Sequence, residues 1–506
     1  MVLDDPALIG ETIRDFEATG RNIETCFQKV AARYIKAFSE FEDKFLAERA
    51  IDLRDVAQRM VKNLLGQAET SLSHLAGQRI IVASDISPSE SATLDRSAAL
   101  ALALNSGSKT SHAAIVARSM RIPSVVSLHN LTARVHNGDW AIVDGYDGLV
   151  IVNPTESTLF RYGKIQERKK SFEARLLESN REPAVTLDGV PVTLLANIEK
   201  AEECAAAKSF RAEGVGLYRT EFLFVDRADL PSENEQYEAY ASIVHAFGGA
   251  TVTLRTFDIG GDKFASSFEL PPEMNPALGL RAIRLALAQP EVFSTQLRAM
   301  VRAARHGNVR IMLPMISTTD EIAAARALLA RAEADVARSF GKRVDPIPLG
   351  AMIEVPAAAV MADVLARHAD FFSIGTNDLV QYALAVDRTS RTLAHLASPL
   401  SPAILRLCAM AIRAANAAKI PVSVCGTMAS EPLHALLLVG LGVRELSMEA
   451  SAIPVVREAI SRASMAELAR IAELCLEAET EARVREAVSS SLGPRLLDLD
   501  AVRDGA

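Results

Sequence analysis

Apolar residues recur at helical spacing through the first 66 residues of the chain. Five of them share one face of a helix predicted over residues 51–66, with charged residues on the other face: Leu53, Val56, Ala57, Met60 and Leu64. Seven apolar positions upstream predict one more amphipathic helix: Phe16, Ile23, Phe27, Val30, Tyr34, Phe38 and Phe41. This pattern favours helices that pack against the rest of the protein. Alternatively, the helices could form a docking face for another protein.

The period changes between residues 70 and 160, where short apolar runs are separated by Gly and Asp. Four of these runs predict strands: residues 78–84, 125–127, 141–145 and 148–154. Among them lies a small polar loop that becomes a helix pattern at His112. The region therefore predicts a small α/β domain that presents one histidine.

His112 lies at a predicted helix start, where unpaired backbone N–H groups and the helix dipole favour an anion. Thr110 and Ser111 can cap the helix, and together with Arg118 they are candidate donors to a phosphoryl group on the imidazole. The alternative is a histidine that merely packs at the start of a helix.

Residues 161–182 are charged and predict a helical linker. Beyond them, eight apolar runs alternate with helical stretches: residues 192–197, 214–219, 252–255, 309–315, 349–354, 371–377, 422–425 and 445–448. Eight buried parallel strands over about 320 residues are the pattern of a (β/α)₈ barrel. The fold class predicted for the whole chain is α/β.

Polar and charged residues collect where these predicted strands end, which is where barrel enzymes build their sites. They are Arg219, Arg255 with Asp258 close by, Glu354, Asn377 with Asp378, and Cys425. Arginines suit a phosphate or a carboxylate, and two neighbouring carboxylates suit Mg²⁺. Arg388 follows a short loop later and could close the site. The set predicts a small phosphorylated carboxylic acid as ligand.

Cys425 has two interpretations. Most free cysteines are buried small apolar residues. At the end of a barrel strand, a thiol could instead exchange a proton with the substrate carbon.

Composition narrows the classes of function. The chain has 506 residues, is 49% hydrophobic and 23% charged, and carries a net charge of -8. This balance argues against nucleic acid or an anionic membrane as the main partner. The five cysteines contain no C-x-x-C pair, and no apolar run reaches the roughly 18 residues of a membrane helix. The start of the chain resembles no secretion signal, which predicts a cytoplasmic protein.

Six stretches make the chain resemble enzyme I of the bacterial phosphotransferase system, the phosphoenolpyruvate–protein phosphotransferase family. They are residues 109–118, 214–224, 255–263, 275–284, 352–357 and 372–388. They span most of the chain in the family's order. Residues 48–59 also resemble part of the family's domain for docking a phosphocarrier protein.

The resemblance implies a role for each candidate. His112 would be the phosphorylated histidine and Cys425 the proton donor that yields pyruvate. Phosphoenolpyruvate would be bound by five residues: Arg219, Arg255, Asn377, Asp378 and Arg388. Glu354 and Asp378 would hold Mg²⁺. The family also implies the phosphocarrier protein HPr as acceptor, a part in sugar transport, and a homodimer formed through the barrel.

Four segments follow from these expectations. Residues 1–68 would form an incomplete helical docking domain, 69–160 a swivelling phosphohistidine domain, 161–185 a helical linker, and 186–506 the barrel with a helical tail. The chain starts inside the helical region, so we expect the phosphohistidine domain to lack an edge strand. Either the start is misassigned, the gene is truncated, or the chain is a piece of a longer protein.

Three residues depart from the family's usual pattern: Thr427 and Ser430 after the cysteine, and Ser401 where the family commonly has histidine. The short N-terminus and Thr427 motivate one alternative, a regulatory relative that binds phosphoenolpyruvate without completing the relay. A second alternative is a relative of phosphoenolpyruvate synthase or pyruvate–phosphate dikinase, which shares a phosphohistidine and a barrel but would need an ATP-binding domain that this chain has no room for.

Overall fold

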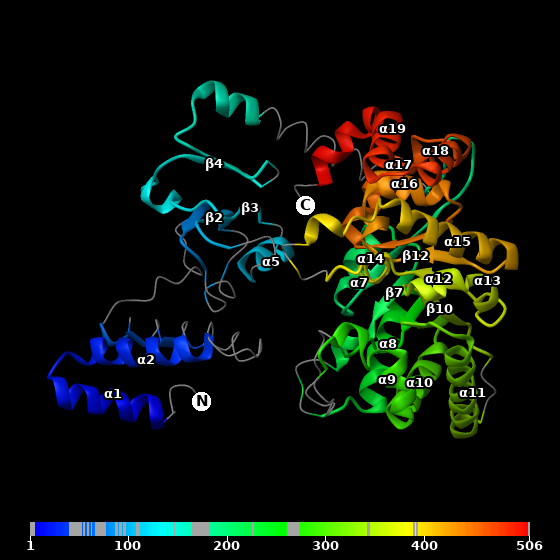
Figure 1. Ribbon diagram of the computed structural model, residues 1–506, viewed down its shortest axis with the longest axis horizontal. Coiled ribbons are helices and arrows are strands. Elements are labelled where there is room, and N and C mark those ends of the chain that lie inside the picture. The colour runs from blue at the N-terminus through cyan, green and yellow to red at the C-terminus, as the bar shows by residue number, and fades with distance from the viewer. Residues whose placement is uncertain are drawn as a thin grey trace. The chain divides into compact units, whose positions relative to one another are not determined.

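The computed structural model describes residues 6–39, 77–86, 98–107, 112–163, 183–260 and 273–503, with isolated positions between 53 and 94. Short gaps inside these ranges fall at 121, 146, 225–226, 228, 342–344, 388–389 and 391–392. The chain divides into two compact units, residues 1–167 with 504–506, and residues 168–503. Figure 1 colours the first blue to cyan and the second green to red.

Two helices open the smaller unit, α1 (Pro6–Thr19) and α2 (Ile23–Ser39). They pack around Leu8, Phe27 and Val30. The single helix predicted across this region is wrong, because Gly20 adopts a left-handed φ of 63° and ends α1 with a bond from its N–H to the Phe16 carbonyl of 2.9 Å. The described residues between 53 and 64 are helical, as the apolar pattern predicts.

A parallel three-stranded sheet forms the next part of this unit, in the order β1 (Arg79–Ala83), β2 (Ala99–Leu104), β3 (Ser124–Val125). Helix α5 (His112–Ser119) connects β2 to β3, and β4 (Ala141–Asp144) pairs with β5 (Leu149–Val152) in an antiparallel hairpin. The central strand β2 is absent from the predicted strands. Its sequence, Ala-Leu-Ala-Leu-Ala-Leu, consists of strong helix formers, and burial between two strands overrides that preference.

The larger unit contains a closed barrel of eight parallel strands, which confirms the predicted fold class (Figure 1). The strands are β6 (Thr193–Ile198), β7 (Val215–Arg219), β8 (Val252–Arg255), β9 (Val309–Leu313), β10 (Leu349–Ile353), β11 (Phe372–Ile374), β12 (Val422–Val424) and β13 (Glu445–Met448). The barrel closes where Leu446 of β13 pairs with Leu194 of β6. Nearly every strand residue is buried, as expected for a parallel sheet covered on both faces.

Helices surround this barrel. They include α7 (Glu203–Ser209), α8 (Glu233–Phe247), α9 (Ile283–Ala288), α10 (Pro290–Ala304), α11 (Thr319–Phe340), α12 (Pro356–Val360), α13 (Ala362–Leu365), α14 (Thr376–Leu384), α15 (Pro402–Ala418), α16 (Pro432–Gly440) and α17 (Ile453–Ser461). Capping boxes begin α8 and α11 at Ser232 and Thr318. Helices α18 (Met465–Glu477) and α19 (Glu481–Arg503) follow the last barrel helix. In the described part of the chain, no helix has the length and apolarity to cross a bilayer.

Candidate active site

The barrel brings together six of the residues that the sequence selects. Arg219 and Arg255 end β7 and β8, Glu354 directly follows β10, and Cys425 directly follows β12. Asn377 and Asp378 lie in the first turn of α14, immediately after β11. All six line one pocket of about 140 Å³. The carboxyl ends of parallel strands meet at one end of a barrel, so residues far apart in the chain share this pocket.

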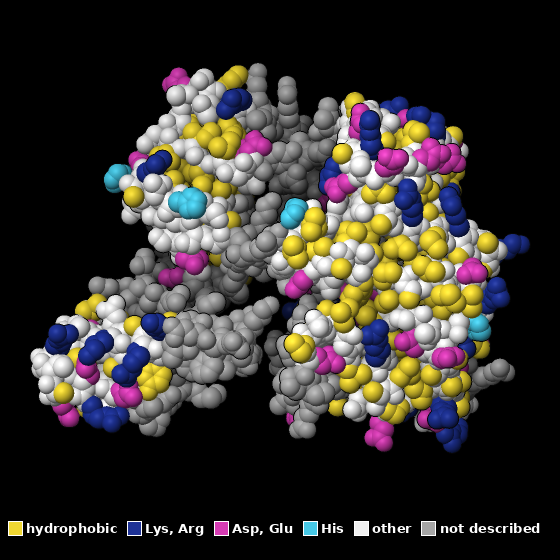
Figure 2. All heavy atoms as spheres, in the orientation of Figure 1, with side chains coloured by type: hydrophobic (Ala, Val, Ile, Leu, Met, Phe, Trp, Pro, Cys, Tyr) yellow, Lys and Arg dark blue, Asp and Glu magenta, His cyan; other side chains and the backbone are white. Residues whose placement is uncertain are grey.

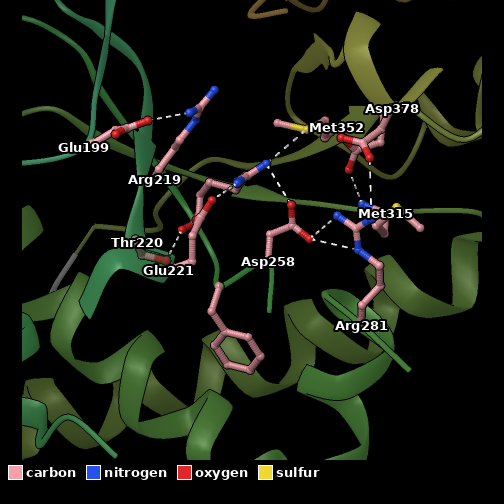
Figure 3. Close-up of polar contacts among 12 residues, drawn as sticks. Glu199, Arg219, Thr220, Glu221, Asp258, Arg281, Met315, Met352 and Asp378 are labelled. Atoms are coloured by element: carbon pink, nitrogen blue, oxygen red, sulfur yellow. Dashed lines mark hydrogen bonds and ion pairs between the residues drawn. The ribbon is translucent and has the colours of Figure 1, made fainter. Parts of the chain in front are cut away.

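An alternating chain of charges passes through the lining of the pocket, to which Arg255, Asp258 and Asp378 belong (Figure 3). Arg255 pairs with Glu221 on one side and, at 3.2 Å, with Asp258 on the other. Asp258 also pairs at 2.8 Å with Arg281, whose guanidinium reaches Asp378 at 3.5 Å. All five residues are buried. Because each buried charge has an opposite neighbour, the arrangement is fixed by electrostatics as well as by packing.

The two arginines of this chain remain protonated. Burial alone disfavours a charged guanidinium, but Glu221 and Asp258 outweigh it and raise the pKa of Arg255. For Arg281, burial is outweighed in the same way by Asp258 and Asp378, and its pKa is also raised. Of these two arginines, Arg255 lines the pocket, where it keeps a permanent positive charge among carboxylates.

Glu221 and Arg281 are absent from the sequence-derived candidates. Arg281 is fully buried, and it precedes α9 next to Ala282, whose φ of 53° and ψ of -128° are unusual for a residue with a side chain. Both residues lie inside stretches that resemble the family, at 214–224 and 275–284. The sequence does hold a signal for these two residues. A charged side chain within an apolar segment next to a strand is seldom exposed to solvent, so it is expected to be buried and paired.

Glu354 and Asp378 form the acidic side of the pocket. Glu354 is 1% exposed, and its Oε1 accepts a bond of 2.6 Å from the Met315 N–H. Burial, then the charges of Asp378 and Asp258, raise the pKa of Glu354 to about 8, against a smaller opposing effect of Arg255. Two buried carboxylates that repel each other suit Mg²⁺, which is commonly held by one or two carboxylates together with substrate phosphate. Within the described residues, no set of three His, Cys, Asp or Glu side chains gathers as a metal site.

Asn377 is oriented by Thr427, one of the residues that depart from the family pattern. Its Oδ1 accepts the Thr427 N–H at 3.0 Å and the Thr427 hydroxyl at 2.9 Å. A backbone N–H can only donate, so the atom that faces it must be the amide oxygen. The NH₂ group of Asn377 therefore lies on the opposite side of the amide.

Cys425 is 5% exposed, and its Sγ lies 3.7 Å from the carbonyl oxygen of Ile374. Burial raises the pKa of this thiol, against the smaller effects of Ser373, Arg255 and Arg219. The side chain therefore keeps its proton at neutral pH. It belongs to a small apolar cluster with Leu217, Met312, Met352 and Phe371, of which Leu217 and Met352 also line the pocket.

Two glycines bring the backbone close to the pocket. A Cβ at Gly375 would lie 2.8 Å from Glu354 Oε2, and one at Gly426 would lie 2.8 Å from the Thr376 nitrogen. Neither position has room for a side chain. Backbone contacts therefore set part of the pocket's width.

The remaining candidates belong elsewhere. Helix α5 begins at His112, so the predicted helix start is present in the smaller unit. The side chains of His112 and Arg118, together with Thr110, Ser111 and Arg388, lie outside the described residues. Arg219, by contrast, is one of the residues that line the pocket, and its half-buried side chain pairs with Glu199 at 2.5 Å (Figure 3).

The sequence matches three families that describe parts of one kind of enzyme. Residues 173–465, more than half of the chain, match "PEP-utilising enzyme, PEP-binding domain". Residues 75–148 match the mobile domain of PEP-utilising enzymes, and residues 1–49 match their N-terminal domain.

Curated relatives agree with these matches. The phosphoenolpyruvate-protein phosphotransferase of Geobacillus stearothermophilus is 42% identical over 96% of this chain and 84% of its own length. Proteins of the same name from Listeria monocytogenes and Staphylococcus aureus are 42% and 40% identical, covering 85% and 86% of their own lengths. The chain belongs to the phosphoenolpyruvate-protein phosphotransferase family. The PEP-binding match of this phosphotransferase contains every barrel strand, and its mobile-domain match contains β1 to β3 and α5.

Proposed function

We propose that this phosphotransferase moves the phosphoryl group of phosphoenolpyruvate to its own His112 and then to a histidine of the phosphocarrier HPr, releasing pyruvate. The observation that carries the proposal is the pocket at the strand ends, where arginines, three buried carboxylates and a buried thiol meet. This combination suits a small anion that carries both a phosphate and a carboxylate. The step would be the first of a sugar phosphotransferase system.

The arginines would bind the substrate and stabilise the transferred group. Charge spreads over the phosphoryl oxygens during transfer, so fixed cations contribute most of the catalysis. Arg255 is held by Glu221 and Asp258, and it is ready for this role before substrate arrives. Arg219, Asn377 and Arg388 would complete the binding set.

Glu354 and Asp378 would hold Mg²⁺, and their burial and mutual repulsion support that assignment. When bound, the ion would neutralise part of the negative charge on the phosphoryl oxygens. Arg281 would keep the Asp378 carboxylate in place through their contact at 3.5 Å.

Cys425 would complete the formation of pyruvate. Once the P–O bond breaks, the enolate carbon accepts the proton of the thiol, and the resulting thiolate regains a proton from solvent. The raised pKa of Cys425 supports this role, because the donor must be protonated when the enolate forms.

The three parts of the chain would divide the work. Helices α1 and α2 belong to the proposed docking domain at 1–68, α5 presents His112 from the proposed mobile domain at 69–160, and the segment 161–185 would link them to the barrel domain at 186–506. The enzyme would act in the cytoplasm, where its five buried free cysteines would stay reduced.

A homodimer would form through the barrel. Exposed apolar side chains along α12 to α15 support this, since Val360, Met361 and Met410 are 56%, 45% and 41% exposed. Figure 2 shows hydrophobic side chains gathered over the middle of the barrel unit. We expect light scattering of the full chain to give a dimer and the Met361→Glu variant to shift it toward a monomer; a monomer at every concentration would contradict the dimer.

The central test is labelling with ³²P-phosphoenolpyruvate and Mg²⁺, with and without a phosphocarrier protein. We expect acid-labile label on the chain that moves to the carrier and is abolished in His112→Ala. Label that stays on the chain would contradict the second transfer. No label on a chain with a folded barrel would contradict the proposal as a whole.

A further inference from the structure

We propose that Gln296 on α10 is a positioning residue, because its side-chain amide ties the ends of β7 and β8 together where the two arginines emerge. The inference deepens the proposed function and rests on it. Gln296 does not line the pocket, and its side chain is fully buried.

The Gln296 amide has a partner on each side. Its Oε1 accepts the Phe257 N–H at 3.0 Å. Its Nε2 donates to the Thr220 hydroxyl at 3.1 Å and to the Tyr240 hydroxyl at 3.1 Å. The backbone N–H of Phe257 can only donate, which fixes the orientation of the amide without ambiguity.

Thr220 extends this connection to the neighbouring strand. Its hydroxyl accepts from Gln296 and donates to the carbonyl of Arg255 at 2.8 Å. Thr220 directly follows Arg219, and Phe257 lies two residues after Arg255. One buried amide therefore holds, through these hydrogen bonds, residues that closely follow both arginines in the chain.

The segment that Gln296 fixes carries a further charged residue. Asp258 follows Phe257 and bridges Arg255 to Arg281. A turn that is free to shift would move Asp258, and with it the pairing of both guanidinium groups. The hydrogen bond to the Phe257 N–H therefore positions the buried charge chain in addition to stabilising the fold.

The third partner, Tyr240, lies on α8, and its hydroxyl connects the amide to that helix. Its hydroxyl donates to Gln236 Oε1 at 3.0 Å, and the Gln236 amide donates to the carbonyl of Pro231 at 3.0 Å. Removing the Tyr240 hydroxyl takes one buried bond from the same amide and leaves its contacts to Thr220 and Phe257. Tyr240→Phe is therefore a matched control for a purely structural effect.

The test compares four full-length variants, Thr220→Val, Thr220→Ser, Gln296→Met and Tyr240→Phe. Binding of phosphoenolpyruvate with Mg²⁺ is measured by calorimetry in a His112→Ala background, and thermal unfolding of the barrel is measured alongside. We expect Thr220→Val and Gln296→Met to raise Kd about tenfold, and Tyr240→Phe to change it less than about twofold at a similar loss of stability. Thr220→Ser keeps the hydroxyl and is expected to bind like the parent.

Equal weakening by Tyr240→Phe and Thr220→Val would overturn the inference, because the effect would then follow stability alone. Unchanged binding in Thr220→Val would overturn it as well, and this variant decides the matter if Gln296→Met does not fold. A parent protein that does not bind phosphoenolpyruvate would overturn the proposed function instead, and the inference with it.

Discussion

The barrel unit and the smaller unit use their interiors in opposite ways. At its pocket the barrel buries alternating charges, from Glu221 through Arg255 and Asp258 to Arg281. In the described part of the smaller unit, Thr12 is the buried polar side chain, and the core around α5 is apolar. The difference teaches where the chemistry is prepared. The barrel fixes charges in advance, whereas the smaller unit supplies a helix that begins at His112, the proposed nucleophile.

Among these substitutions, Arg255→Ala should have the largest effect, because it disrupts the buried charges of the barrel. The substitution leaves Glu221 and Asp258 as buried carboxylates without their shared cation. We expect the barrel to lose about 3–5 kcal/mol in free energy of unfolding, and labelling of His112 to stop. Denaturant unfolding and the labelling assay measure the two effects.

Arg326→Ala is the matched control for that experiment. Arg326 pairs with Asp370 at 3.1 Å, but its side chain is 43% exposed. We expect a loss of no more than about 1 kcal/mol and unchanged labelling. If both substitutions lowered the free energy of unfolding equally, the buried charges would contribute no more to stability than an exposed ion pair.

Leu102→Ala should disrupt the apolar core of the smaller unit. Leu102 is fully buried at the centre of β2, so its truncation should cost the smaller unit about 2–5 kcal/mol. Calorimetry should show the transition of the smaller unit moving down while that of the barrel stays in place. Leu100→Ala, on the same strand but 48% exposed, is the control. A shift of both transitions would mean that the two units do not unfold separately.

Glu354→Gln should change how the stability of the barrel depends on pH. The carboxyl has a pKa of about 8 in the fold against an ordinary 4.5, so between these values the folded state holds more protons than the unfolded state. Without Mg²⁺, the free energy of unfolding of the barrel should therefore fall as pH rises, by up to about 1.4 kcal/mol per pH unit. Glu354→Gln should remove this slope, and Mg²⁺ should stabilise the parent at pH 8 more than the variant. Equal slopes would refute the assignment.

Thr427→Ala should have the smallest effect. It removes the hydroxyl that holds Asn377 and leaves the Thr427 N–H bond in place. We expect KM for phosphoenolpyruvate to rise about two- to fivefold with kcat little changed, and Thr427→Ser to behave like the parent. A drop in kcat at constant KM would indicate a different role for Thr427.

Sequence reasoning succeeds where one physical effect dominates. Burial on both faces makes each barrel strand an apolar run, so all eight are recognisable, and the residues that follow them fall together by geometry. It fails at β2, where Ala and Leu favour a helix in isolation, and at Gly20, where one left-handed residue divides a periodic pattern. It also misses Arg281. The apolar residues around Arg281 indicate that it is buried, but they do not identify its partners, Asp258 and Asp378, which lie 23 positions before it and 97 after it.

Gly375 and Gly426 restrict which strand–helix modules can be exchanged between this barrel and a related one. Gly375 follows β11 and abuts Glu354, which follows β10, while Gly426 follows β12 and abuts Thr376. Each contact fixes one strand–helix module against the next with no tolerance for a methyl group. In this barrel the natural unit of exchange at this side is therefore a block of three consecutive modules. A chimera that replaces the middle one alone would need glycine at position 375 and a residue at position 376 that fits against Gly426.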